Sequence, residues 1–234
     1  MVQAQAKSTA LLLFTRTPKE EALVKDFSDV HSLRSNSIIA SHLISHAEKT
    51  ARATGLPCFV INSSQQHGNT FGERLSDAFS QIFNLGYHQV IAIGNDCPTL
   101  SQNDLLQAAA QLSDNNAILG PASDGGLYLI GLHKNAFLPQ QFANLPWETA
   151  NVNRMMQRYL TENQINFLVG EEKTDIDYSS QFYPLLHNNN IPYQLRVLIR
   201  SILASIGLNF KLIRQNLSLK NHRIYTSLRA PPAV

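Results

Sequence analysis

Alternation between short apolar runs and helix-like segments constrains the fold of this 234-residue chain more than any other feature. Runs with the length and composition of buried strands occur at residues 8–16, 57–62 and 89–94. Segments with helical spacing follow them at 35–55, 71–86 and 101–112. The polar stretch between the first strand and the first helix is expected to be irregular. Because strand–helix–strand units with short connections place their strands parallel, we expect an α/β fold with helices on both faces of a mostly parallel sheet.

The alternation of strands and helices changes after residue 112. Two apolar runs, 117–120 and 127–132, flank a turn with proline and glycine, which predicts a hairpin or an antiparallel edge on the sheet. A helix at 148–164, a strand at 165–170 and a short helix near SSQFYPLLH complete this part. The loop signal NNNIP then separates a body, residues 1–189, from a C-terminal extension, residues 190–234.

Charge is divided unevenly between these two parts. The body carries 12 basic and 17 acidic side chains, a net charge of −5, whereas the extension carries seven basic and no acidic ones. The extension also has apolar residues at helical spacing, namely Leu195, Leu198, Ile199, Ile202, Leu203 and Ile206. Such an amphipathic helix packs on its own body, packs on a second subunit of a homodimer, or binds an anionic membrane surface. No nucleic-acid partner is expected, because the extension lacks a recognised motif.

Composition excludes several other classes of protein. Hydrophobic residues make up 44% of the chain, but no apolar run approaches the roughly 20 residues of a membrane-spanning helix. The N-terminal segment MVQAQAKSTALLLF lacks a signal-peptide cleavage pattern. Cys58 and Cys97 are too few for a disulfide framework and lack the paired spacing of a zinc site. A globular cytoplasmic protein with free thiols is therefore expected.

Carboxylates follow three of the expected strands. Asp96 follows the third apolar run, Asp124 precedes a Gly-Gly pair in the hairpin turn, and Asp175 and Asp177 follow the last strand. Each of them alone is explained as a turn former or a helix cap. Alternation along an extended Asp-Ile-Asp would send both of the last two carboxylates to one side. Because ligands of open α/β sheets bind beyond the carboxyl ends of the strands, the three points together predict a divalent cation shared with phosphate oxygens.

Five segments match the motif series of a known family: GNDCPTL, AILGPASDGGLYLIGL, GNTFGERLSDAF, PWETANVNRMM and DIDYSSQF. On these motifs residues 8–187 resemble a bacterial family of uncharacterised glycosyltransferase-like proteins, the radical-SAM- or selenodomain-associated transferase type. That family is similar to the molybdenum-cofactor and phospholactate guanylyltransferases of the nucleotide-diphospho-sugar transferase superfamily. The resemblance implies a GT-A fold, a three-layer α/β/α sandwich with a mostly parallel mixed sheet.

The same resemblance implies roles for individual residues. Asp96 would be catalytic by holding Mg or Mn against the diphosphate, and Asp177 would supply a second carboxylate to the metal. Asp124 would be a second catalytic residue in the acceptor or sugar pocket. The implied nucleotide-binding residues are Arg16, Lys25 and Asn95. The implied substrate-pocket residues are Gly125, Gly126 and Trp147.

The chain departs from the family pattern after the first strand. Relatives carry a segment like KxPxxGxVKTRL, whose glycine and basic residues clasp the phosphates, whereas this chain reads TRTPKEEALVKDF. Acidic side chains in this segment would weaken phosphate binding. Two hypotheses therefore stand. One is a metal-dependent glycosyl or nucleotidyl transferase that uses a nucleotide or nucleotide-sugar and an unknown small-molecule acceptor; the other is a degenerate, non-catalytic nucleotide-binding or interaction protein.

Overall fold

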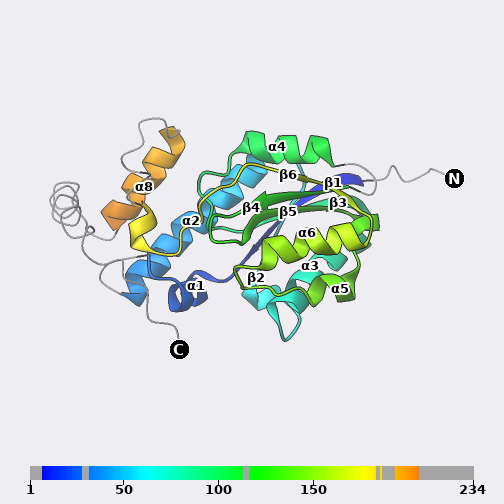
Figure 1. Ribbon diagram of the computed structural model, residues 1–234. Helices are drawn as coiled ribbons and strands as arrows, with labels where there is room; N and C mark the ends of the chain where they lie inside the picture. Colours follow the sequence, from blue (N-terminus) through cyan, green and yellow to red (C-terminus); the bar gives the residue numbers. More distant parts are fainter. Residues whose placement is uncertain (1–6, 28–31, 113–115, 183–184, 186–192, 206–234) are drawn as a thin grey trace, which may run out of the picture.

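The structure, a computed structural model, describes residues 7–27, 32–112, 116–182, 185 and 193–205, which form a three-layer sandwich (Figure 1). A six-stranded sheet in the order β2-β1-β3-β5-β4-β6 is the central layer. Its strands are β1 (Lys7–Thr15), β2 (Cys58–Asn62), β3 (Tyr87–Ile93), β4 (Asn116–Pro121), β5 (Leu127–His133) and β6 (Asn166–Val169). Strand β1 pairs in parallel with β2 and β3, and β4 with β6, whereas β5 runs antiparallel to both of its neighbours. The expected mixed, mostly parallel sheet with a β4–β5 hairpin is confirmed.

The two faces of the sheet bury separate apolar cores, because successive side chains of a strand point to opposite faces. One helical layer contains α3 (Phe71–Asn84), α5 (Pro139–Ala143) and α6 (Val152–Glu162), and the other contains α2 (Leu33–Ala53) and α4 (Gln102–Gln111). In β1, Leu12 packs in the first core, whereas Leu11 and Leu13 pack in the second, and all three are fully buried. The apolar run of β1 is continuous because its side chains pack into an apolar core on both faces of the sheet.

The segment after β1 differs from the sequence expectation. Residues Pro18–Val24 form a short helix, α1, where irregular chain was expected. Thr17 caps this helix by accepting a hydrogen bond from the Glu20 amide, and the Glu20 carboxylate accepts one from the Thr17 amide. Pro18 suits the first turn, where its missing amide hydrogen costs nothing. The capping pattern Thr-x-x-Glu is visible in the sequence and would have predicted the helix.

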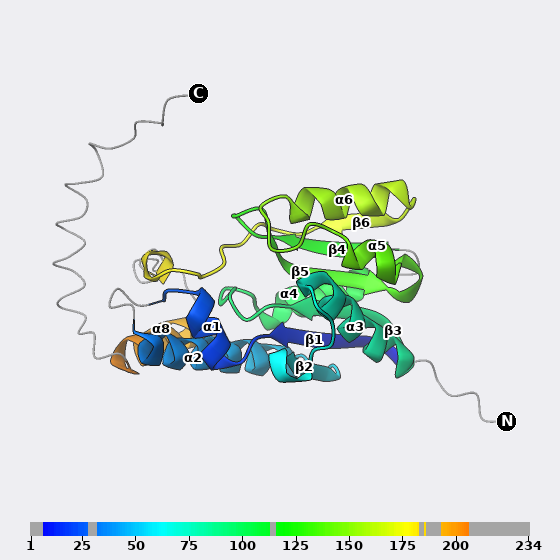
Figure 2. The ribbon, with the colours of Figure 1, turned by 90° about the horizontal axis from the view of Figure 1, so that it is seen from below.

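The C-terminal helix α8 (Tyr193–Ser205) lies beside α2 (Figure 2). Ile199 is buried, and Leu198 packs against a cluster that includes Phe27 and Ile176. Contacts of this helix with a second subunit or a membrane, and the boundary at residue 189, stay predictions. Within the described part of the chain no helix has both the length and the hydropathy to cross a bilayer. Other members of the expected apolar stripe lie outside the described side chains, namely Leu195, Ile202, Leu203 and Ile206.

Strand ends bring residues that are distant in the sequence to one edge of the sheet. Leu13 of β1 pairs in parallel with Ile93 of β3, so Arg16 and Asp96, which follow these strands, leave the sheet near each other. Because β5 is antiparallel to β3, the turn that precedes it, with Asp124, lies at the same edge. Ligands of open α/β sheets bind at such an edge.

Candidate functional site

Backbone hydrogen bonds fasten three separate segments at this edge. The Ile176 amide donates to the Asp96 carbonyl at 2.7 Å, and the Asp26 amide donates to the Asp177 carbonyl at 3.0 Å. Ile176 is 1% exposed and packs into the body. The neighbouring carboxylates, Asp175 and Asp177, both face the cavity at the sheet edge, as alternation along an extended chain predicts.

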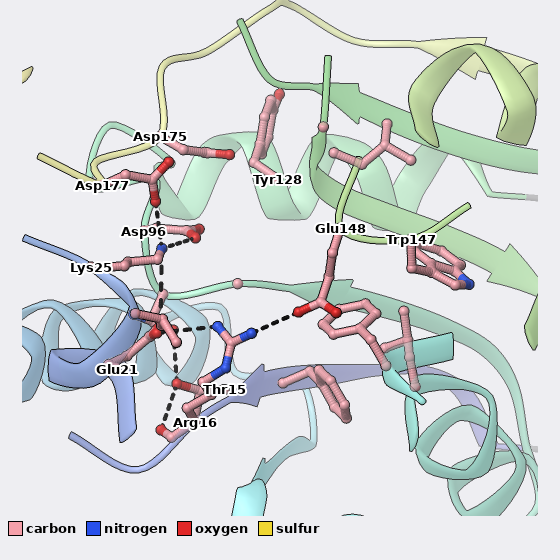
Figure 3. Close-up of a pocket in the computed structure, with 18 of the residues that line it drawn as sticks. Thr15, Arg16, Glu21, Lys25, Asp96, Tyr128, Trp147, Glu148, Asp175 and Asp177 are labelled. Carbon is pink, nitrogen blue, oxygen red and sulfur yellow. Dashed lines mark hydrogen bonds and ion pairs between the residues drawn. The ribbon is translucent and has the colours of Figure 1, made fainter. Parts of the chain in front are cut away.

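This cavity has a volume of about 1000 Å³ (Figure 3). Gly125 is not among the described residues that line it. Its φ is +91°, and a Cβ there would lie 2.2 Å from the Ala150 carbonyl oxygen, so turn geometry and close packing account for this glycine. The cavity brings together the other eight residues that the resemblance implies, namely Arg16, Lys25, Asn95, Asp96, Asp124, Gly126, Trp147 and Asp177.

The Lys25 ammonium lies at the centre of the acidic end of the cavity (Figure 3). Its Nζ is 2.5 Å from Asp96 Oδ2, 2.9 Å from Asp177 Oδ1 and 3.9 Å from Glu21 Oε1. Burial lowers the pKa of Lys25, but the carboxylates of Asp96, Glu21 and Asp177 together raise it well above its ordinary value. Lys25 is therefore a charged ammonium neutralised by carboxylates.

A further carboxylate, Asp175, has no such ion pair among the described residues. Its Oδ1 is buried and has no hydrogen-bond partner among the described residues. Burial, and then the negative charges of Asp96 and Asp124, raise the pKa of Asp175 from 3.8 to about 8. A buried carboxylate beside like charges needs either a proton or a cation.

Arg16 bridges two carboxylates next to this acidic end. Its Nη1 is 3.3 Å from Glu21 Oε2, and its Nη2 is 2.8 Å from Glu148 Oε1. Glu21 is 2% exposed, so the ion pair is buried on that side. Glu148 has a φ of +59°, a strained backbone conformation of the kind that occurs at functional sites. The guanidinium thus holds α1 and the segment before α6 together.

Asn95 and Trp147 line the cavity while the protein holds each of them in place. Asn95 is 4% exposed and accepts a hydrogen bond from Thr15 Oγ1 at 2.7 Å, which ties the ends of β1 and β3 together. Trp147 donates from Nε1 to the Phe142 carbonyl at 2.9 Å and packs on Phe71, with ring centroids 5.7 Å apart. Both side chains therefore stiffen the walls of the cavity.

The sequence profile of a bacterial family, DUF2064, described as "Uncharacterized protein conserved in bacteria", matches residues 30–149, slightly more than half of the chain. The chain belongs to the DUF2064 family. The matched residues include Asp96, Asp124 and Trp147, whereas Lys25 and Asp177 lie outside the match. Comparison with curated proteins gives no significant match.

Solved structures similar to this DUF2064 protein include a provisionally named nucleotide-diphospho-sugar transferase from Desulfovibrio desulfuricans G20. That structure is 21% identical, covers 85% of this chain and 99% of its own, and has a TM-score of 0.68. A glycosyltransferase involved in glycosylation of the major capsid of PBCV-1 is 13% identical. The match covers 70% of this chain and 81% of that protein, with a TM-score of 0.46. A nucleotidyl transferase from Methanothermobacter thermautotroptrophicus is also 13% identical. The match covers 78% of this chain and 96% of that protein, with a TM-score of 0.43. The first likeness confirms the expected fold of the nucleotide-diphospho-sugar transferases.

The acidic end of the cavity offers carboxylate oxygens, which suit a divalent cation. Carboxylate oxygens are the ligands that Mg and Mn prefer, and Asp175 contributes a buried oxygen with no partner in the described part of the chain. Yet the described residues include no group of three carboxylate, histidine or cysteine side chains already arranged to hold a metal. Since the Lys25 ammonium lies within 3 Å of both Asp96 and Asp177, a metal bound by those two carboxylates requires Lys25 to move.

Two carboxylates of this site, Glu21 and Glu148, had no role assigned from the sequence, and Asp175 was counted among the acidic points without a role of its own. Asp175 was recognisable as the second carboxylate on one side of Asp-Ile-Asp. Glu21 would have followed from the capping signal that predicts α1. Glu148 carries no local signal, because its contact with Arg16 joins positions 132 residues apart.

Proposed function

We propose that this protein is a metal-dependent transferase that acts on a nucleotide or nucleotide-sugar in the cavity at the sheet edge, by glycosyl or nucleotidyl transfer. The relationship to the radical-SAM-associated type and to the guanylyltransferases, and a cytoplasmic location, belong to this proposal. The observation that carries it is Asp175, whose buried Oδ1 has no partner in the described chain and faces further carboxylates. Asp96 and Asp177, with Asp175 beside them, are the residues that would hold Mg or Mn.

The charge of the cavity supports a cation as part of the ligand. Three basic and seven acidic side chains are among the described residues that line it, a formal charge of −4, or −3 while Asp175 keeps its proton. A phosphate charge placed about 4 Å from one unpaired carboxylate is repelled by about 4 kcal/mol at the effective dielectric constant of a protein surface. A divalent ion removes this repulsion and, when bound, neutralises charge that develops on a leaving phosphate group.

The chain's own residues would bind and orient the substrate. Arg16 offers guanidinium hydrogen bonds from the cavity wall. Trp147 and Phe71 offer an aromatic surface, and Trp147 lies at the end away from the aspartates (Figure 3). Asp124 accepts a hydrogen bond from the Gly126 amide at 2.8 Å, which orients its carboxylate in the turn. In that position Asp124 would accept a proton or hydrogen bond from the acceptor.

A non-catalytic nucleotide-binding or interaction protein is the second candidate. One observation favours it, because the two basic side chains of the segment after β1 that line the cavity, Arg16 and Lys25, are both already paired with carboxylates. Turnover separates the two candidates. A screen of nucleoside triphosphates and sugar nucleotides with Mn should release a product if the protein is a transferase.

Titration calorimetry tests the proposed site directly. We expect one of these nucleotides to bind in the presence of Mn and to lose at least about tenfold in affinity when EDTA is added or when Asp96 is changed to Asn. Glu162→Gln is the control, since this carboxylate pairs with Arg158 on the exposed face of α6. Nucleotide binding that is equally tight in Asp96→Asn would remove Asp96 from the site.

A further inference from the structure

The same carboxylates would have to hold both Lys25 and a metal ion. Nζ of Lys25 donates a hydrogen bond to Asp96 Oδ2 at 2.5 Å and forms an ion pair with Asp177 Oδ1 at 2.9 Å. A Mg ion bound to such oxygens needs them at about 2.1 Å in octahedral geometry. An ammonium and a divalent cation cannot share this space, since the two positive charges would be only a few ångströms apart.

The backbone around Lys25 is fixed, so any exchange of cations is a motion of the side chain. The Lys25 amide donates to the Glu21 carbonyl at 2.9 Å, and the Lys25 carbonyl accepts from Asn36 Nδ2 at 3.1 Å. The next residue, Asp26, donates its amide to the Asp177 carbonyl at 3.0 Å. Four side-chain torsions remain by which the ammonium can leave the carboxylates without unfolding the segment.

The cavity has room for the Lys25 ammonium at a second position. Leu23, Val24 and Tyr178 at its rim are exposed, so the space beside Lys25 is open toward solvent. An anion bound beside Arg16 would lie within the same cavity as Lys25. Moving the Lys25 ammonium from its three carboxylates to such an anion costs little free energy once another cation compensates the charges of Asp96 and Asp177.

We propose that Lys25 is a displaceable internal counter-ion that occupies the cation position between Asp96 and Asp177 and competes with a divalent metal for it. The inference rests on the proposed use of a metal at this site. In the ligand-free protein the ammonium compensates the carboxylates and keeps stray cations out. When a metal enters, the ammonium turns to the phosphates of the nucleotide. Because the freed ammonium gains a partner only when an anion is present, metal and phosphate strengthen each other's binding by the same factor.

Binding of Mn alone, without nucleotide, tests the competition. Titration followed by the electron paramagnetic resonance of free Mn should show at least tenfold tighter binding to Lys25→Met than to the wild type. Lys19→Met, which removes an exposed lysine of the same helix, should bind Mn as the wild type does. The double variant Lys25→Met, Asp96→Asn should lose this gain in Mn affinity. Equal or weaker Mn binding by Lys25→Met overturns the proposal.

Chemical labelling provides a second test on the wild-type chain, in case Lys25→Met does not fold. Acetic anhydride followed by mass spectrometry measures the reactivity of each lysine, with the exposed Lys19 as internal reference. Saturating Mn should raise the labelling of Lys25 relative to Lys19 at least several-fold, because its ammonium leaves the carboxylates. Unchanged labelling in a protein that binds Mn contradicts the proposal.

The two proposals fail in different ways. If no variant binds Mn, the competition is wrong, whatever the turnover screen gives. If Lys25→Met binds Mn more tightly and no substrate turns over, the competition stands and only the transferase is contradicted.

Discussion

Replacing Asp175 with Asn should stabilise the ligand-free protein, and by more at higher pH. The Oδ1 atom of Asp175 is buried, and burial together with the charges of Asp96 and Asp124 raises the pKa of this carboxyl group from 3.8 to about 8. The folded protein therefore holds a proton that the unfolded chain releases. An asparagine of the same shape needs no proton and carries no charge.

The size of the effect follows from proton linkage. Between pH 4 and pH 8 the unfolded chain has lost the Asp175 proton while the folded chain keeps it, so the wild type loses about 1.4 kcal/mol of stability per pH unit at this residue. Below about pH 3 both states are protonated and the penalty vanishes. With the pKa rising from 3.8 to about 8, the stabilisation by Asn is expected to be about 2 kcal/mol at pH 5 and about 4 kcal/mol at pH 7.

Urea unfolding at pH 5, 6 and 7 in the presence of EDTA measures this difference. Glu172→Gln is the matched control, since it removes an exposed carboxylate from the same segment and should change the free energy of unfolding by less than about 0.5 kcal/mol. A difference between Asp175→Asn and wild type that stays constant with pH would refute the reasoning. So would a destabilisation that grows with pH, because it would mean that ionised Asp175 has a partner in the folded protein.

Two further predictions concern the scaffold. A Cβ at Gly72 would lie 2.0 Å from the Ala143 carbonyl oxygen and 2.5 Å from Trp147 Cδ1, so Gly72→Ala should cost about 3 kcal/mol and lower the melting temperature by about 6–12 °C. Gly170→Ala, whose Cβ would meet only ordinary contacts, is the control, and an equal change in both variants would contradict the packing argument. Burial raises the pKa of the Cys97 thiol to about 12, so the thiol stays protonated at pH 8 and should react with Ellman's reagent only after unfolding. Rapid labelling of Cys97 in the folded Cys58→Ser variant would show this to be wrong.

Much of the fold follows from periodicity in the sequence. Residues 9–15 of β1 are buried, and this strand was recognisable as a continuous apolar run. The hairpin of β4 and β5 was recognisable from its Pro- and Gly-containing turn. The first helix was missed because the acidic, polar segment 17–24 has little apolar periodicity, although Thr17 and Glu20 form a capping box. Carboxylates after β3, in the hairpin turn and after β6 were expected at one edge because strand ends meet there, and the cavity does bring them together.

The sequence by itself determined the α/β class, the order of the strands along the chain and the set of carboxylates that follow them. These depend on local patterns of apolar and polar residues. Only the tertiary structure decided what those carboxylates contact. Lys25 and Asp96 are 71 positions apart, and their contact depends on α1 ending beside the third strand and on the backbone bonds that hold Asp177 there. A sequence lists which charges are present, whereas their pairing and their pKa values depend on distances of a few ångströms between separate segments.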